Sequence, residues 1–115
     1  MIMEIVYATT WLKKRCDNER EANKEWGAMV AKKLRQRLAE LKAAPRLSDI
    51  SPHRPARLHE LDHDRAGQLA VDLHDGFRLV FVPNHEPKPT KADGGLDRDR
   101  VTSIKIVEVG DYHGT

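Results

Sequence analysis

The stretch QLAVDLHDGFRLVFV (68–82) decides the fold, because it contains two β-strands joined by a tight turn. Valine, leucine and phenylalanine dominate residues 68–73 and 77–82, as is typical of strands. Between them stands His74-Asp75-Gly76, and Asp-Gly is one of the strongest signals for a hairpin turn. The stretch therefore predicts an antiparallel hairpin made of Gln68–Leu73 and Phe77–Val82.

The second strand of this hairpin also predicts which side chains are buried. Successive side chains of a strand point to opposite faces of the sheet. If Phe77, Leu79 and Phe81 face the core, Arg78 and Val80 face the other side. Arg78 is then a cation on an open sheet face.

Working outward from the hairpin, three further strands and two helices are expected. The strands are residues 2–7, Arg57–Leu61 and Val101–Val109. Thr9 or Thr10 caps a short helix that runs to Arg15, and Asn18 caps a long helix that ends near Ala44, before Pro45. The long helix has one apolar stripe, formed by Ala22, Trp26, Val30, Leu34, Leu38 and Leu41. This order predicts an α+β fold in which an N-terminal strand and two helices pack on an antiparallel sheet.

Length and composition predict one small domain over residues 1–115. Hydrophobic residues make up 39% and charged residues 33%, and no apolar run approaches the roughly 20 residues that cross a bilayer. The N-terminus lacks the basic start of a signal peptide, and the single Cys16 excludes an intrachain disulfide. A cytoplasmic protein without a membrane anchor is expected. The proline- and glycine-rich residues 83–100 are expected to form a flexible loop within that domain.

A basic stretch at residues 32–46 suggests one kind of partner. Its formal charge is +5, from six Lys and Arg residues against Glu40. Lys32, Lys33, Arg35 and Arg37 are therefore candidate contacts to RNA phosphates. The alternative is that they form an ordinary solvated helix face.

The chain closes its last predicted strand with Asp111-Tyr112-His113, three residues suited to proton transfer. His59 lies at the end of another predicted strand, and Arg78 faces the open side between them. A base, an acid and a phosphate-binding cation are what RNA cleavage through the ribose 2′-hydroxyl needs. The alternative is a polar cap, ordinary edge histidines and an ion pair between Arg78 and Asp72.

A metal site is not expected. His59 and His63 have a metal-ligand spacing of four residues, but they lie where a strand enters a turn. Residues four apart converge on a helix and not on an extended chain, and no further ligands stand at suitable spacing.

Residues 57–83 and 106–114 together resemble the HigB branch of the RelE/ParE toxin superfamily. The similar motifs are Leu58-His59-Glu60-Leu61, Asp64-Arg65-Ala66-Gly67, the hairpin ending in Phe77-Arg78-Leu79-Val80-Phe81, and the terminal Asp111-Tyr112-His113. The resemblance implies a RelE-like fold and the toxin of a type II toxin–antitoxin system. Such a toxin cleaves mRNA on the ribosome without a metal or other cofactor. Its expected partner is a helix-turn-helix antitoxin similar to HigA.

By position, the resemblance implies catalytic roles for His59, Asp111, Tyr112 and His113, with Arg78 beside the scissile phosphate. One position departs from the pattern: Asp62 stands where a lysine is expected. Arg65 or Lys105 would have to supply that charge to the RNA. Because of Asp62, a second interpretation remains: a catalytically degenerate module that only binds a partner. A third interpretation is a ParE-like inhibitor of DNA gyrase.

Overall fold

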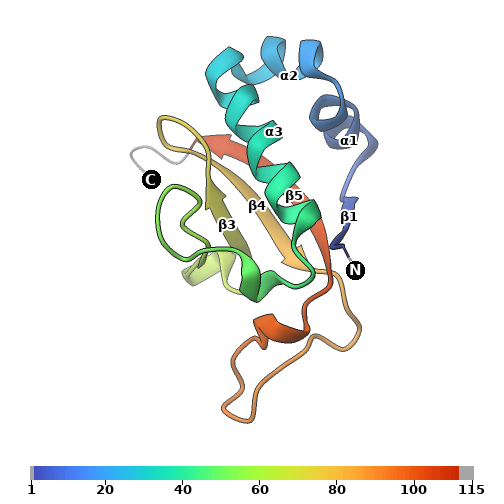
Figure 1. Ribbon diagram of the computed structural model, residues 1–115, viewed down its shortest axis with the longest axis vertical. Coiled ribbons are helices and arrows are strands. Elements are labelled where there is room, and N and C mark those ends of the chain that lie inside the picture. Colours follow the sequence, from blue (N-terminus) through green and yellow to red (C-terminus); the bar gives the residue numbers. More distant parts are fainter. Residues whose placement is uncertain (1, 112–115) are drawn as a thin grey trace.

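The structure, a computed structural model, describes residues 2–111. Helices cover one face of a five-stranded sheet whose strand order is β1-β5-β4-β3-β2 (Figure 1). This confirms the predicted α+β class. The strands are β1 (Glu4–Tyr7), β2 (His59–Glu60), β3 (Leu69–Asp72), β4 (Phe77–Pro83) and β5 (Ser103–Asp111). The α-helices are α1 (Thr10–Asp17), α2 (Glu19–Trp26) and α3 (Ala28–Ala43), and η1 (Leu47–Asp49), η2 (His63–Arg65) and η3 (Arg98–Arg100) are short 3₁₀ turns.

The sheet is antiparallel except at one edge. The pairs β2–β3, β3–β4 and β4–β5 are antiparallel, whereas β1 runs parallel to β5, with Glu4 beside Ser103. The prediction of a wholly antiparallel sheet is therefore wrong for β1. Parallel neighbours need a long crossover connection, and the helices and strands between β1 and β5 provide one.

The central hairpin is confirmed. Strands β3 and β4 pair with Asp72 opposite Arg78, and the turn is closed by backbone hydrogen bonds from the Leu73 N–H to the Phe77 oxygen and from the Phe77 N–H to the His74 oxygen. Asp75 and Gly76 have φ angles of 50° and 83°, the left-handed geometry that hairpin turns of this type require.

The long helix predicted from Asn18 to Ala44 is wrong, because it is broken into α2 and α3. Asn18 does cap α2, since its side chain accepts a hydrogen bond from the Glu21 backbone at 3.0 Å. Gly27 stands between the two helices with φ 88° and ψ 156°, outside helical geometry. Glycine adopts this conformation without the strain that a Cβ would add.

Replacing Gly27 by alanine is expected to lower the free energy of unfolding by about 1 kcal/mol. A Cβ at this position meets no atom within 4 Å, so the cost comes from the positive φ and not from a clash. Urea unfolding measures the change. Gly95→Ala is the matched control, because Gly95 lies outside the positive-φ region and its Cβ would meet only the ends of two flexible side chains, Asp93 at 3.1 Å and Lys91 at 3.5 Å. An unchanged stability for Gly27→Ala would favour the continuous helix.

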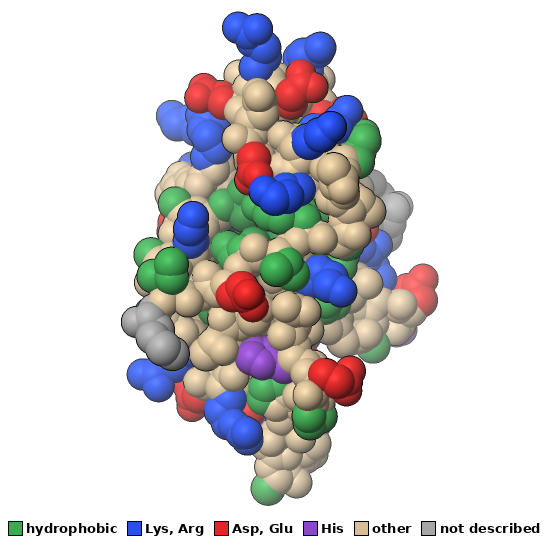
Figure 2. Space-filling model, turned by 90° about the vertical axis from the view of Figure 1, so that its right-hand side faces the viewer, with side chains coloured by type: hydrophobic (Ala, Val, Ile, Leu, Met, Phe, Trp, Pro, Cys, Tyr) green, Lys and Arg blue, Asp and Glu red, His purple; other side chains and the backbone are tan. Residues whose placement is uncertain are grey.

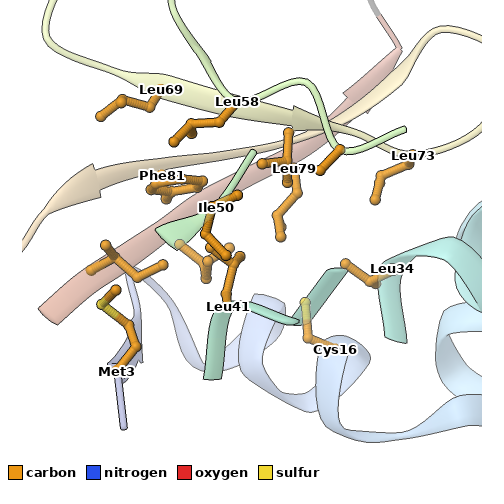
Figure 3. Close-up of a cluster of buried hydrophobic side chains, with 14 of the residues drawn as sticks. Met3, Cys16, Leu34, Leu41, Ile50, Leu58, Leu69, Leu73, Leu79 and Phe81 are labelled. Atoms are coloured by element: carbon orange, nitrogen blue, oxygen red, sulfur yellow. The ribbon is translucent and has the colours of Figure 1, made fainter. Parts of the chain in front are cut away.

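The main core lies between the helices and one face of the sheet (Figure 3). Leu79 and Phe81 of β4 are fully buried and belong to the same cluster as Leu34 and Leu41 of α3. Val80 instead belongs to a small cluster on the opposite face, made of Leu61, Ala70 and Val80. The predicted alternation along β4 is therefore confirmed, and Arg78 lies on the face that the helices leave open.

The connection from β4 to β5 was predicted to be a flexible loop, and that remains a prediction. The structure gives it a hydrogen-bonded path: Thr90 and Leu96 form an isolated bridge, and the His85 ring accepts hydrogen bonds from the backbones of Thr102 and Ser103. Arg98 contacts Glu60 at 3.7 Å, so the loop reaches β2. Over residues 2–111, no helix is long and apolar enough to span a membrane.

Candidate active site

A pocket of about 600 Å³ lies on the open side of the sheet, next to the edge strand β2. β2 and the chain that follows it, the start of β4 and the end of β5 build it. Its walls hold four carboxylates, two arginines and two histidines, and they are formed by His59, Glu60, Leu61, Asp62, His63, Asp64, Arg65, Arg78 and Asp111. The structure thus brings together His59, Arg78, Arg65 and Asp111, four of the predicted site residues.

Strand register places His59 and Arg78 in this pocket. His59 of β2 pairs with Ala70 of β3, and Ala70 pairs with Val80 of β4. Side chains directly opposite one another share a face, and Arg78 lies two residues from Val80 on that face. Arg78 Nη1 lies 3.5 Å from His59 Nε2. Both side chains are half-buried.

The His59 ring has a defined tautomer. Its Nδ1 lies 2.7 Å from the backbone oxygen of Arg57. A carbonyl oxygen can only accept a hydrogen bond, so Nδ1 must carry the proton. In the neutral ring Nε2 is then an acceptor that faces the pocket and Arg78. This is the form in which a histidine can take a proton from a substrate hydroxyl.

Asp72 does not form the ion pair with Arg78 that the alternative interpretation expected. Its carboxylate binds Arg57 twice, with Nε 2.6 Å from Oδ2 and Nη2 3.0 Å from Oδ1. The hydrogen bond to Asp72 raises the pKa of Arg57, so its guanidinium stays charged. Arg57 has φ 50°, outside strand geometry, so the predicted strand Arg57–Leu61 starts later than expected, and β2 contains only His59 and Glu60.

A lysine was expected where Asp62 stands. Of the two residues considered as a substitute for its positive charge, Arg65 lies at the pocket and Lys105 does not. Arg65 lines the pocket, and its guanidinium contacts the carboxylate of Glu108 and the side chain of Gln68. Lys105 is exposed on β5 and does not line the pocket. Asp62 is exposed at its rim.

The basic residues of α3 lie elsewhere. None of Lys32, Lys33 or Arg35 lines the pocket, because α3 packs on the opposite face of the sheet. Arg37 is only 2% exposed and donates a hydrogen bond to the backbone oxygen of Asp72 at 2.9 Å. A side chain with that burial is not available to RNA on the surface, so the prediction for Arg37 is wrong.

Two predicted residues, Tyr112 and His113, lie outside the described residues. Two residues that the structure adds are Arg57 and His63. His63 lines the pocket with φ 60°, and it had been considered only as a metal ligand. Its place in the turn between two strands was the available signal. Among residues 2–111, no group of three or more His, Cys, Asp or Glu side chains could hold a metal ion.

Comparison with known proteins gives the fold and little else. No family model matches the chain, and no curated protein sequence matches it. Among solved structures, a YoeB/ParE toxin from Agrobacterium tumefaciens aligns with 96% of this chain and 100% of its own. The TM-score is 0.53 and the sequence identity 12%. The chain therefore shares the fold of that toxin.

Proposed function

We propose that this chain is the toxin of a type II toxin–antitoxin system and cleaves mRNA on the ribosome, in the cytoplasm, without a metal. One observation carries the proposal: a histidine whose acceptor nitrogen faces an arginine 3.5 Å away, in a pocket at the open face of the sheet. The shared fold with a YoeB/ParE toxin and the similarity of the motifs to HigB-like toxins support it.

The pocket residues fit a reaction through the ribose 2′-hydroxyl. Nε2 of His59 takes the hydroxyl proton, and the 2′-oxygen forms a bond to phosphorus while the bond from phosphorus to the 5′-oxygen breaks. Arg78 binds the non-bridging phosphate oxygens, whose negative charge grows in the transition state. The products end in a 2′,3′-cyclic phosphate and a 5′-hydroxyl.

The leaving 5′-oxygen needs a proton from an acid. The resemblance nominates His113, with Tyr112 stacking on a base and Asp111 orienting the histidine or the substrate. Within the described residues, His63 lines the same pocket and is a second candidate acid. Arg65 supplies additional positive charge to the RNA.

A second candidate function is favoured by the four carboxylates of the pocket. Glu60, Asp62, Asp64 and Asp111 repel phosphate. A degenerate toxin that keeps the fold and only binds a partner would tolerate such a pocket. Substrate cleavage distinguishes the two functions.

The partner would bind on the other side of the molecule. A groove of about 500 Å³ lies there between β1, α1 and α3. Its basic residues are Lys13, Arg35 and Lys42, against one carboxylate, Asp17. Figure 2 shows the molecule from the side of β1 and α1, where hydrophobic side chains at the centre are surrounded by Lys and Arg side chains with some Asp and Glu side chains among them.

The floor of this groove is uncharged. Met3, Ile5 and Leu38 line it, and burial raises the pKa of Cys16 and of Tyr7 to about 12, so both stay neutral at physiological pH. An acidic amphipathic segment of a HigA-like antitoxin complements such a surface. Lys32, three residues before Arg35, extends the basic face along α3.

The test of this function is cleavage of a defined mRNA by the purified chain, with translating ribosomes and without them. The chain is first treated with EDTA and then freed of the chelator, so that the ribosomes keep their Mg²⁺. We expect cuts within the reading frame only when ribosomes are present, and the same cuts from treated and untreated chain. The 5′-hydroxyl ends identify the chemistry. A folded protein that cuts no transcript under any of these conditions would instead support the degenerate module.

A further inference from the structure

The orientation of His59 depends on a backbone oxygen that the chain holds in a strained position. That oxygen belongs to Arg57, whose φ of 50° lies in the left-handed region. For a residue with a Cβ this conformation is strained, so surrounding contacts must maintain it.

The Arg57 side chain is clamped by Asp72. Two parallel hydrogen bonds, at 2.6 and 3.0 Å, join the planar guanidinium to the carboxylate. Such a fork fixes direction as well as distance. The Leu58 N–H, in the same peptide plane as the Arg57 carbonyl, donates to the Ser51 oxygen at 2.9 Å, and with the clamp it directs that carbonyl toward Nδ1 of His59.

Asp72 is itself fixed by three parts of the fold. Its backbone oxygen accepts the hydrogen bond from the buried Arg37 of α3, and its backbone nitrogen donates to the oxygen of Ala56 at 2.8 Å. In the sheet it stands opposite Arg78. One residue thus positions both groups of the proposed site, His59 through Arg57 and Arg78 through the strand register.

We propose that Arg57 and Asp72 are positioning residues that hold His59 in the tautomer with the proton on Nδ1. The catalytic consequence rests on the proposed function, whereas the tautomer does not. If the Arg57 carbonyl turned away, the proton could move to Nε2. That form presents an N–H to Arg78 and to the substrate hydroxyl, and it cannot accept the hydroxyl proton.

The experiment compares Asp72→Asn with wild type by nitrogen-15 NMR of the histidine rings, at a pH where the rings are neutral. His59→Gln assigns the His59 signals. We expect wild-type Nε2 to have the shift of an unprotonated nitrogen and Nδ1 that of a protonated one. In Asp72→Asn the two shifts should approach each other, because both tautomers become populated.

The rate of RNA cleavage is measured on the same proteins. For Asp72→Asn, kcat should fall about 10- to 100-fold while KM stays nearly constant, since the base is misplaced and substrate contacts remain. Arg57→Lys can keep one hydrogen bond to Asp72, so its kcat should fall less than that of Asp72→Asn. Asp75→Asn, an exposed carboxylate in the turn of the same hairpin, is the matched control and should change neither shifts nor rate.

Two results would overturn the inference: a wild-type His59 with its proton on Nε2, or a folded Asp72→Asn protein with unchanged shifts. If Asp72→Asn does not fold, Arg57→Gln is used in its place, because it removes the same clamp. The nitrogen-15 shifts of His59 in that variant then test the inference. If the nitrogen-15 shifts of His59 are as expected but wild type cleaves no RNA, the proposed function is contradicted and the positioning role remains.

Discussion

Replacing His59 by glutamine is expected to lower kcat for RNA cleavage by about 10²- to 10⁴-fold. Glutamine has a similar reach and can hydrogen-bond, but it cannot take a proton at neutral pH. The measurement is single-turnover cleavage of a ribosome-bound transcript, together with growth arrest when the chain is expressed without its antitoxin.

His74→Gln is the control for this change. His74 is exposed in the turn between β3 and β4 and does not line the pocket, so its replacement should leave cleavage unchanged. If His59→Gln retained the wild-type rate in a folded protein, the base would have to be another residue, and His63 or His113 would be replaced next.

Replacing Arg37 by alanine is expected to lower the free energy of unfolding by about 2–4 kcal/mol. The change leaves a cavity in the core and removes the hydrogen bond to the Asp72 backbone. Glu40, which contacts the Arg37 guanidinium at 3.3 Å, is 40% exposed and remains hydrated, so no carboxylate is stranded in the core. Chemical denaturation measures the loss.

Arg35→Ala separates this role from RNA binding. Arg35 lies on the same helix but is exposed, so its loss should change stability by less than about 0.5 kcal/mol. RNA affinity of folded Arg37→Ala should equal that of wild type. A drop in RNA affinity without a drop in stability would restore Arg37 as an RNA contact.

The strands of the hairpin could be predicted because their pattern is local. The alternation of Leu79 and Phe81 with Arg78 and Val80 records which face each side chain meets, and Asp75-Gly76 fixes the turn. From these the open-face position of Arg78 followed directly. Its proximity to His59 also followed, since only one strand, β3, separates β4 from β2.

The helices were less predictable because an apolar stripe does not reveal where a helix breaks. The spacing of Trp26 and Val30 suits a continuous helix, yet Gly27 between them interrupts it. The position of Arg37, three residues after Leu34 and four before Leu41, lies on the buried stripe. Its spacing is that of a buried residue, whereas its charge suggests a surface role. The guanidinium can be buried because it donates a hydrogen bond to the backbone oxygen of Asp72 in β3.

The role assigned to Arg57 could not be predicted from sequence. It rests on a backbone oxygen and a positive φ, and the residue type indicates neither of them. The partner of Asp72 was also missed, because the residue directly opposite in the ladder, Arg78, was the natural choice. Both features depend on how the loop after η1 returns to the sheet.

The parallel pairing of β1 with β5 has a consequence for the timing of folding. Glu4 is synthesised 99 residues before Ser103, so β1 waits for its neighbour while those residues are made. Contacts between such distant parts of a sequence form slowly. Asp111, at the end of β5, completes the pocket. A growing chain therefore carries an unfinished sheet and no finished pocket, and the proposed activity would begin only once that strand had left the ribosome.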